Sequence, residues 1–103
     1  MLTPEQIQSM VEVIDQAIHP EKIILFGSYA KGSQTPNSDI DLLIVKQSDL
    51  PPRHRSAEVK KLLRSFHIPK DIIVVTPTEF NRYQHWVGTI IRPAVLEGNI
   101  LYG

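Results

Sequence analysis

The chain has 103 residues and no cysteine, and it carries eleven Lys and Arg against eleven Asp and Glu, so its formal net charge is zero. The lack of cysteine excludes disulfides, thiolate zinc sites and cysteine nucleophiles. Balanced charge argues against a broad cationic face for nucleic acid. No apolar run approaches the roughly 20 residues of a membrane span, and no signal-peptide pattern opens the chain. We therefore expect a cytoplasmic protein with no membrane contact, whose residues 1–103 form one domain.

Two helices are predicted in the first two thirds of the chain. Thr3-Pro4-Glu5-Gln6 is a capping box with proline at the first helical position, and apolar residues follow at helical spacing up to Ile18. His19-Pro20 is expected to end this helix, because the residue before a proline is disfavoured in the helical conformation. The second helix follows Pro51-Pro52. Its apolar residues at helical spacing are Val59, Leu62, Leu63 and Phe66.

A further helical stretch is predicted near the end of the chain. Thr76-Pro77-Thr78-Glu79 repeats the capping box. The apolar residues that follow it at helical spacing are Phe80, Tyr83, Val87, Ile90 and Ile91. Gly88 and Pro93 lie inside this stretch and predict a break or kink. The residues from Glu97 to Tyr102 predict the end of a helix followed by a short extended piece.

Three short apolar runs predict strands that alternate with these helices. Residues 23–26 are stopped by Gly27, residues 40–45 are interrupted only by Asp41, and residues 71–75 are rich in β-branched side chains. Strands alternating with helices indicate a layered α/β domain.

The first candidate site is the turn Gly27-Ser28, directly after the first predicted strand. Glycine lets a ligand approach the main chain closely, and a helix starting at Ser28 would direct free N–H groups at an anion such as phosphate. Lys31 adds a nearby positive charge. Taken alone, the pair more often forms a plain strand-to-helix turn with Ser28 as the cap.

Carboxylates form the second candidate site. Asp39 and Asp41 are two residues apart at the start of a strand, so both point to one side of it. A divalent cation would relieve their repulsion, since Mg²⁺ prefers oxygen ligands; the alternative is a solvated strand end. Asp71, at the start of the third predicted strand, would add a third carboxylate if that strand lies alongside. Three carboxylates and a phosphate turn suit metal-assisted phosphoryl or nucleotidyl transfer.

These motifs together resemble a known family. Gly27-Ser28, ten intervening residues, Asp39-Ile40-Asp41 and a later strand opened by Asp71 are similar to the DNA polymerase β-type nucleotidyltransferase superfamily. The string from Gly27 to Gly32, continued by Ser38 to Leu42, most resembles its minimal, single-domain branch, which contains the MNT antitoxins of MNT–HEPN toxin–antitoxin systems. The resemblance implies the nucleotidyltransferase fold, a small mixed sheet of about three core strands flanked by helices.

The resemblance also implies a role for each site residue. Asp39, Asp41 and Asp71 would hold two Mg²⁺ ions, and Asp71 would help to deprotonate the acceptor hydroxyl. The nucleotide, ATP, would be bound by Gly27, Ser28, Lys31 and Ser38. The implied reaction transfers AMP to a tyrosine of a partner HEPN ribonuclease toxin, with which the chain would form a hetero-oligomer, and direct nucleic-acid binding is not expected.

Two alternatives remain open at this point: a non-catalytic antitoxin that neutralises its toxin by binding, and a nucleotidyltransferase that acts on a small molecule or RNA. Lys70 departs from the family pattern, which has an apolar residue before the third carboxylate, and its cation could weaken metal binding at Asp71. The four histidines show no paired metal spacing. The basic residues from Arg53 to Arg64 are interpreted as a solvated helix face that could also meet an acidic partner or RNA.

Overall fold

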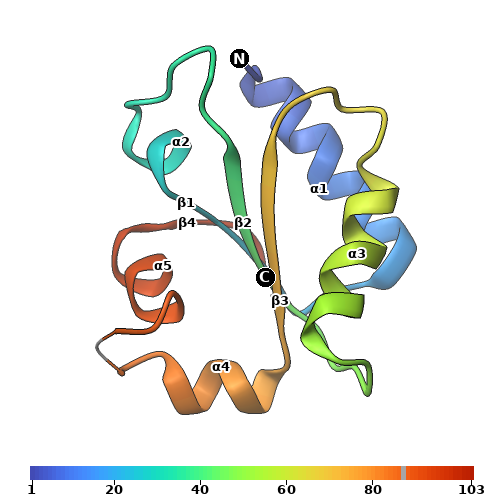
Figure 1. Cartoon of the computed structure of the whole chain (residues 1–103), viewed down its shortest axis with the longest axis vertical. Helices are drawn as coiled ribbons and strands as arrows, with labels where there is room; N and C mark the ends of the chain where they lie inside the picture. The colour runs from blue at the N-terminus through green and yellow to red at the C-terminus, as the bar shows by residue number, and fades with distance from the viewer. Residues whose placement is uncertain (87) are drawn as a thin grey trace.

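A computed structural model describes residues 1–86 and 88–103, and its elements alternate along the chain (Figure 1). The helices are α1 (Pro4–Ile18), α2 (Ser28–Lys31), α3 (Pro52–Leu62), α4 (Pro77–Tyr83) and α5 (Ile91–Glu97), and the strands are β1 (Lys22–Phe26), β2 (Ile40–Val45), β3 (Lys70–Val75) and β4 (Asn99–Tyr102). In the described part of the chain, no helix is long and apolar enough to span a bilayer.

The four strands form one mixed sheet in the order β3-β2-β1-β4. Strand β1 pairs antiparallel with both β2 and β4, whereas β2 and β3 are parallel. A parallel pair needs a crossover connection, which α3 supplies between β2 and β3. Because β1 runs against β2 and β3, its C-terminal end lies at the same end of the sheet as the beginnings of β2 and β3.

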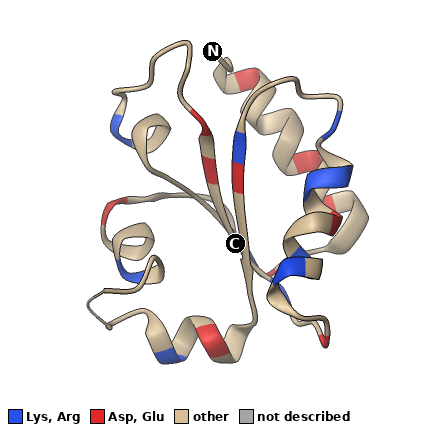
Figure 2. Cartoon of the chain, viewed as in Figure 1, with Lys and Arg blue, Asp and Glu red and all other residues tan. Residues whose placement is uncertain are grey.

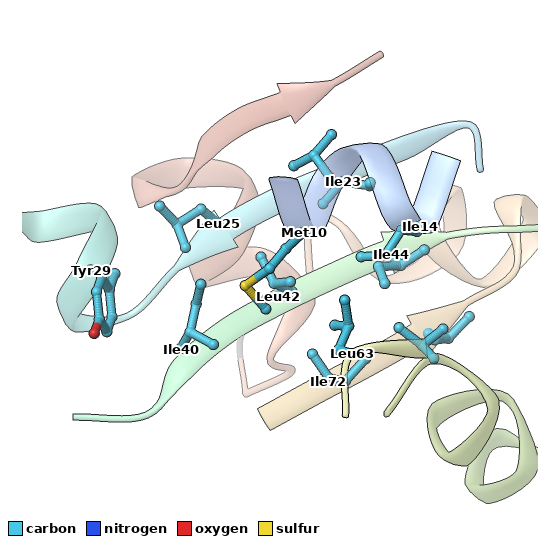
Figure 3. Close-up of a cluster of buried hydrophobic side chains, with 13 residues drawn as sticks. Met10, Ile14, Ile23, Leu25, Tyr29, Ile40, Leu42, Ile44, Leu63 and Ile72 are labelled. Atoms are coloured by element: carbon cyan, nitrogen blue, oxygen red, sulfur yellow. The ribbon is translucent and has the colours of Figure 1, made fainter. Parts of the chain in front are cut away.

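Helices cover both faces of the sheet, with α1 and α3 on one face and α4 and α5 on the other (Figure 1). Alternate residues of β2 serve the two layers, as the two-residue period of a strand requires. Ile40, Leu42 and Ile44 are fully buried with Met10 and Ile14 of α1, and Figure 3 shows this cluster. Leu43 and Val45 pack instead with Phe80 of α4 and with Ile91 and Ala94 of α5. Strand β2 is thus buried from both sides.

Several sequence predictions are confirmed by this architecture. The α/β class, the mixed sheet and the three predicted strands are present. Both predicted capping boxes form: the Gln6 N–H donates to the Thr3 hydroxyl and the Glu79 N–H donates to the Thr76 hydroxyl. The first helix ends where the His19-Pro20 pair predicted, with His19 in the left-handed conformation at a φ of 47°.

Other predictions need correction. The sheet has four strands rather than about three, because the tail pairs with β1 as β4. The second predicted helix ends at Leu62, so Leu63 and Phe66 pack from the turns that follow. The helical stretch after Thr76 is broken as expected, since α4 ends at Tyr83 and α5 begins at Ile91, but the break is not at Pro93. Pro93 lies in the first turn of α5, where a missing N–H costs nothing. Val87, also assigned to that stretch, lies outside the described residues.

A buried arginine connects the layers. Arg55 of α3 is 9% exposed, and its guanidinium donates to the carbonyl oxygens of Leu50 and Val74 and to the Glu79 carboxylate, the last at 2.8 Å. Burial alone would raise the pKa of Glu79. The N–H of Thr76 and the guanidinium of Arg55 outweigh it and hold that pKa below its usual value. Glu79 therefore closes a capping box and an ion pair at once.

The Arg55–Glu79 pair predicts a pH-dependent part of the stability. A carboxyl whose pKa falls on folding stabilises the fold above its unfolded pKa, near 4.5, and this stabilisation is lost as the pH falls through the folded pKa. We expect Glu79→Gln to lower the free energy of unfolding at pH 7. At acidic pH, the variant and the wild type should have the same free energy of unfolding. Urea unfolding across this range checks it, with the exposed Glu58→Gln on α3 as control. Equal loss at pH 7 and at low pH would contradict the prediction.

Candidate active site

The turn between β1 and α2 is shaped by Gly27. This residue has a φ of 72° and a ψ of −153° and forms the N-cap of α2 without a side-chain hydrogen bond. Its carbonyl oxygen accepts from the N–H groups of Ala30 and Lys31, at 3.1 and 3.2 Å. The N–H groups of Ser28 and Tyr29 stand in the first turn, where helix geometry provides no intrahelical acceptor. The turn can therefore offer main-chain donors and the Ser28 hydroxyl to an anion.

Asp41 lies directly against this turn. It is the register partner of Phe26 on β1, the residue before Gly27, and of Asp71 on β3. A Cβ atom added to Gly27 would stand 2.1 Å from the Oδ2 atom of Asp41. Residue 27 must therefore be glycine both for its positive φ and for the space that the Asp41 carboxylate fills.

The other two carboxylates lie at the same end of the sheet. Asp71 is directly beside Asp41 on a strand about 4.8 Å away. Asp39 stands just before β2, two residues from Asp41, and both Asp39 and Asp71 are exposed. Figure 2 shows the acidic residues of β2 and β3 next to each other at the end of the sheet where these strands begin. The sequence prediction that β3 would bring a third carboxylate to the edge of Asp39 and Asp41 agrees with this register.

Asp41 is perturbed by its surroundings. Partial burial raises the pKa of Asp41, and the charges of Asp71 and then Asp39 raise it further. A carboxyl whose pKa is raised by folding makes the folded state less stable once it ionises, so this arrangement costs stability at neutral pH. A cation beside the three groups would reverse the effect, since an opposite charge favours the ionised form.

These residues fit a divalent cation. Within residues 1–86 and 88–103, no group of three or more His, Cys, Asp or Glu is gathered tightly enough to hold a metal ion by itself. Mg²⁺, however, is usually bound by one or two carboxylates together with substrate phosphates and water. The in-register pair Asp41 and Asp71, with the Asp41 carboxylate lying against the Gly27 turn, meets that requirement.

The remaining predicted nucleotide-binding residues lie at the margin of the turn. Lys31 ends α2, and its ammonium pairs with the Glu97 carboxylate of α5 at 3.3 Å. Both side chains are more than half exposed, so the pair is weak and can open. The Ser38 hydroxyl accepts from the Thr35 N–H at 2.8 Å and closes the loop before Asp39. Glu97 was not identified from the sequence, where no local signal connects it with Lys31.

Lys70 does not face Asp71. Neighbouring residues of a strand point to opposite faces. The Lys70 ammonium donates to the carbonyl oxygens of Phe66, at 2.7 Å, and Ile68, at 2.9 Å, in the loop between α3 and β3. Lys70, which departs from the family pattern, therefore places its cation at that loop and not beside the Asp71 carboxylate.

Together, the mixed sheet, the glycine turn after β1 and the aspartates of β2 and β3 define a nucleotidyltransferase core. The chain belongs to the nucleotidyltransferase domain family, whose profile matches residues 7–97, and it is accordingly a nucleotidyltransferase. It is 39% identical over 82 residues to MJ0604 of Methanocaldococcus jannaschii, a candidate protein adenylyltransferase, and the match covers 80% of this chain and 78% of that protein.

Solved structures share the fold. A chain of a toxin–antitoxin complex with AMP-PNP aligns with a TM-score of 0.67 at 22% identity, covering 93% of this chain and 73% of its own. A chain of the toxin–antitoxin pair MntA–HpeT, carrying two Asp-to-Glu substitutions, aligns with a TM-score of 0.65 at 24% identity, covering 99% of this chain and 74% of its own.

The close approach of Gly27 and Asp41 predicts a non-additive pair of substitutions. Gly27 and Gly32 share a φ of 72°, but a Cβ on Gly32 would meet nothing within 4 Å. Gly27→Ala should therefore cost about 1–3 kcal/mol more than Gly32→Ala, which carries the backbone strain alone. Urea unfolding of both variants measures this excess.

The same excess should largely disappear in an Asp41→Ala background, because Oδ2 and Cγ of Asp41 are the two atoms nearer than 3.4 Å to the added Cβ. A double-mutant cycle over Gly27 and Asp41 gives the coupling. Additive effects would show that Asp41 does not occupy this space.

Proposed function

We propose that the chain transfers AMP from ATP to a tyrosine hydroxyl of a partner HEPN-type ribonuclease toxin and so acts as its antitoxin. The observation that carries the proposal is the placement of the Asp41 carboxylate between the Gly27 turn and Asp71. This arrangement joins an anion-binding turn to an acidic edge that fits a divalent cation, which is what nucleotidyl transfer requires.

Each site residue has its own role in the proposed reaction. The main-chain N–H groups and hydroxyl at Gly27 and Ser28 bind the β- and γ-phosphates, with Lys31 and Ser38 at the margin of the nucleotide. Asp71 takes the proton of the acceptor hydroxyl as its oxygen attacks the α-phosphorus; the bond to the bridging oxygen breaks and pyrophosphate leaves. Two Mg²⁺ ions, held by Asp39, Asp41 and Asp71, would neutralise charge on the attacking and leaving oxygens.

Two observations support a protein as the acceptor. MJ0604, a relative that matches most of the chain, bears the name of a protein adenylyltransferase, and the structural neighbours are chains of toxin–antitoxin complexes. In addition, large apolar side chains are exposed after α4, on α5 and on β4: Trp86 is 58%, Leu96 67% and Ile100 64% exposed. Exposed apolar and aromatic groups of this kind are typical of surfaces that bind proteins.

Transfer is tested directly by mass measurement. The purified chain, ATP and Mg²⁺ are incubated with the proposed HEPN-type toxin partner, and we expect the toxin to gain the mass of one or more adenylyl groups on a tyrosine. Asp39→Asn/Asp41→Asn should abolish the adduct, because amides neither carry the charge nor replace the carboxylate oxygens. Asp49→Asn, an exposed aspartate in the loop after β2, is the matched control and should label fully.

The outcomes separate the alternatives. If the double Asn variant still protects cells from the toxin, the chain neutralises by binding alone. If wild-type protein leaves the toxin unlabelled but transfers AMP to RNA or a small molecule, the acceptor class is wrong. An adduct of equal yield with the double Asn variant would sink the assignment of the site.

Lys70 provides a second prediction, because its ammonium serves the α3–β3 loop and not Asp71. Lys70→Met removes charged donors from two carbonyl oxygens and should cost about 1–3 kcal/mol of stability in urea unfolding. The Mg²⁺ concentration for half-maximal transfer should stay unchanged, whereas Asp71→Asn should raise it. A shift in the Mg²⁺ requirement of Lys70→Met would mean that this cation acts on the metal site.

A further inference from the structure

The turn that would bind phosphate belongs to a very short helix. Helix α2 has four residues, and a helix of one turn has little stability of its own. Its position must therefore come from contacts with the rest of the chain. On the side of α1, Tyr29 is buried in the core that contains Met10, and its hydroxyl accepts from the Leu2 N–H at 3.1 Å. This contact holds one side of α2.

The junction between α5 and β4, residues 97–99, holds the other side of α2 (Figure 1). The ammonium of Lys31 pairs with the Glu97 carboxylate at 3.3 Å, and the Asn99 amide donates a long hydrogen bond to the Ala30 carbonyl oxygen at 3.5 Å. Within residues 1–86 and 88–103, the Lys31–Glu97 pair is the only ion pair that includes a residue of α2. Residues 97–99 thus supply polar contacts to α2 from the face that α5 covers.

The junction is itself packed tightly against the strand that leads into the turn. Gly98 has no room for a side chain, because a Cβ atom there would meet the carbonyl oxygens of Ala94 and of Leu25, the second at 2.8 Å. Its φ of −83° is ordinary, so space and not backbone conformation requires glycine at this position. Asn99 is the register partner of Leu25, so the junction meets β1 just before the glycine turn. Glu97 is therefore presented from a support that is fixed to β1.

We propose that Glu97 is a positioning residue of the nucleotide site. Through its ion pair with Lys31 it holds α2, and with it the Gly27-Ser28 turn, in the orientation that binds the β- and γ-phosphates. The proposal rests on the phosphate-binding role that the proposed function gives to this turn. A carboxylate repels phosphates, so Glu97 acts through Lys31 and does not itself touch the nucleotide.

Competition between Glu97 and the phosphates for the Lys31 ammonium would have the opposite sign. In that case Glu97 would neutralise a cation of the site, and its removal would tighten nucleotide binding. The position of Lys31 favours the first role. Lys31 ends α2, whereas the free N–H groups of the turn stand at its beginning. Asn99, from the same junction, also contacts α2 near its end.

Nucleotide binding without any acceptor tests the proposal. Isothermal titration calorimetry in the presence of Mg²⁺ measures the Kd of ATP and of tripolyphosphate, which has the phosphates but no nucleoside. We expect Glu97→Gln to raise both Kd values about two- to fivefold, the range that an exposed ion pair provides. An equal change for both ligands is what a displaced phosphate turn produces.

A double-mutant cycle with Lys31→Met shows whether Glu97 acts through Lys31. In the Lys31→Met background, Glu97→Gln should weaken neither ligand further. The matched control is Glu58→Gln, which removes the same charge at an exposed position of α3, on the opposite face of the sheet from α5. It should bind ATP like the wild type. Urea unfolding confirms that all variants are folded.

Each other outcome overturns the proposal. Tighter ATP binding by Glu97→Gln would mean that Glu97 competes for Lys31, and equal losses in both backgrounds would mean that it acts independently of Lys31. A loss for ATP but not for tripolyphosphate would place the effect at the nucleoside, and unchanged binding would show that the pair positions nothing. No ATP binding by the wild type would overturn the proposed function as well. A toxin left unlabelled by protein that binds ATP would contradict only the proposed acceptor.

Discussion

The register of β2 between its two neighbours is the constraint on which the active site depends. Its antiparallel pairing with β1 places Asp41 opposite Phe26 and against Gly27, and its parallel pairing with β3 places Asp41 beside Asp71. A slip of one residue would turn Asp41 to the other face of the sheet and bury it among the side chains of α1 and α3. The same slip would turn Ile40, Leu42 and Ile44 away from the core that now buries them completely. Core packing therefore fixes the position of the Asp41 carboxylate.

That fixed register also holds together groups that repel one another. Burial and the charges of Asp71 and Asp39 raise the pKa of Asp41, so the ionised site opposes folding. The two cores on either face of β2 supply the opposing stability, since both are formed by apolar, mainly aliphatic side chains that are nearly or fully buried. An apolar residue at position 41 would stabilise a strand whose only role was structural, because Leu43 and Val45, on the same face of β2, are already apolar. This cost is what the proposed site for a cation and phosphates would entail before the cation binds.

Much of the site could be predicted because its signals are local. Gly27-Ser28 ends an apolar run, and Asp39 and Asp41 share one side of a strand by their two-residue spacing alone. The position of Asp71 beside Asp41 depends on which strands are neighbours, and only the family resemblance supplied that information. The direction of the Lys70 side chain depends on carbonyl oxygens in the loop after α3. The Lys31–Glu97 pair and the fourth strand likewise depend on tertiary contacts between residues far apart in the chain.

The zero net charge conceals a local separation of charge at the start of β3. Strand β3 lies on the boundary, with Asp71 on the face of the carboxylates and Lys70 on the face of α3. In the proposed function a nucleoside triphosphate, itself strongly negative, would bind at the carboxylates, where the local field repels it unless cations accompany it.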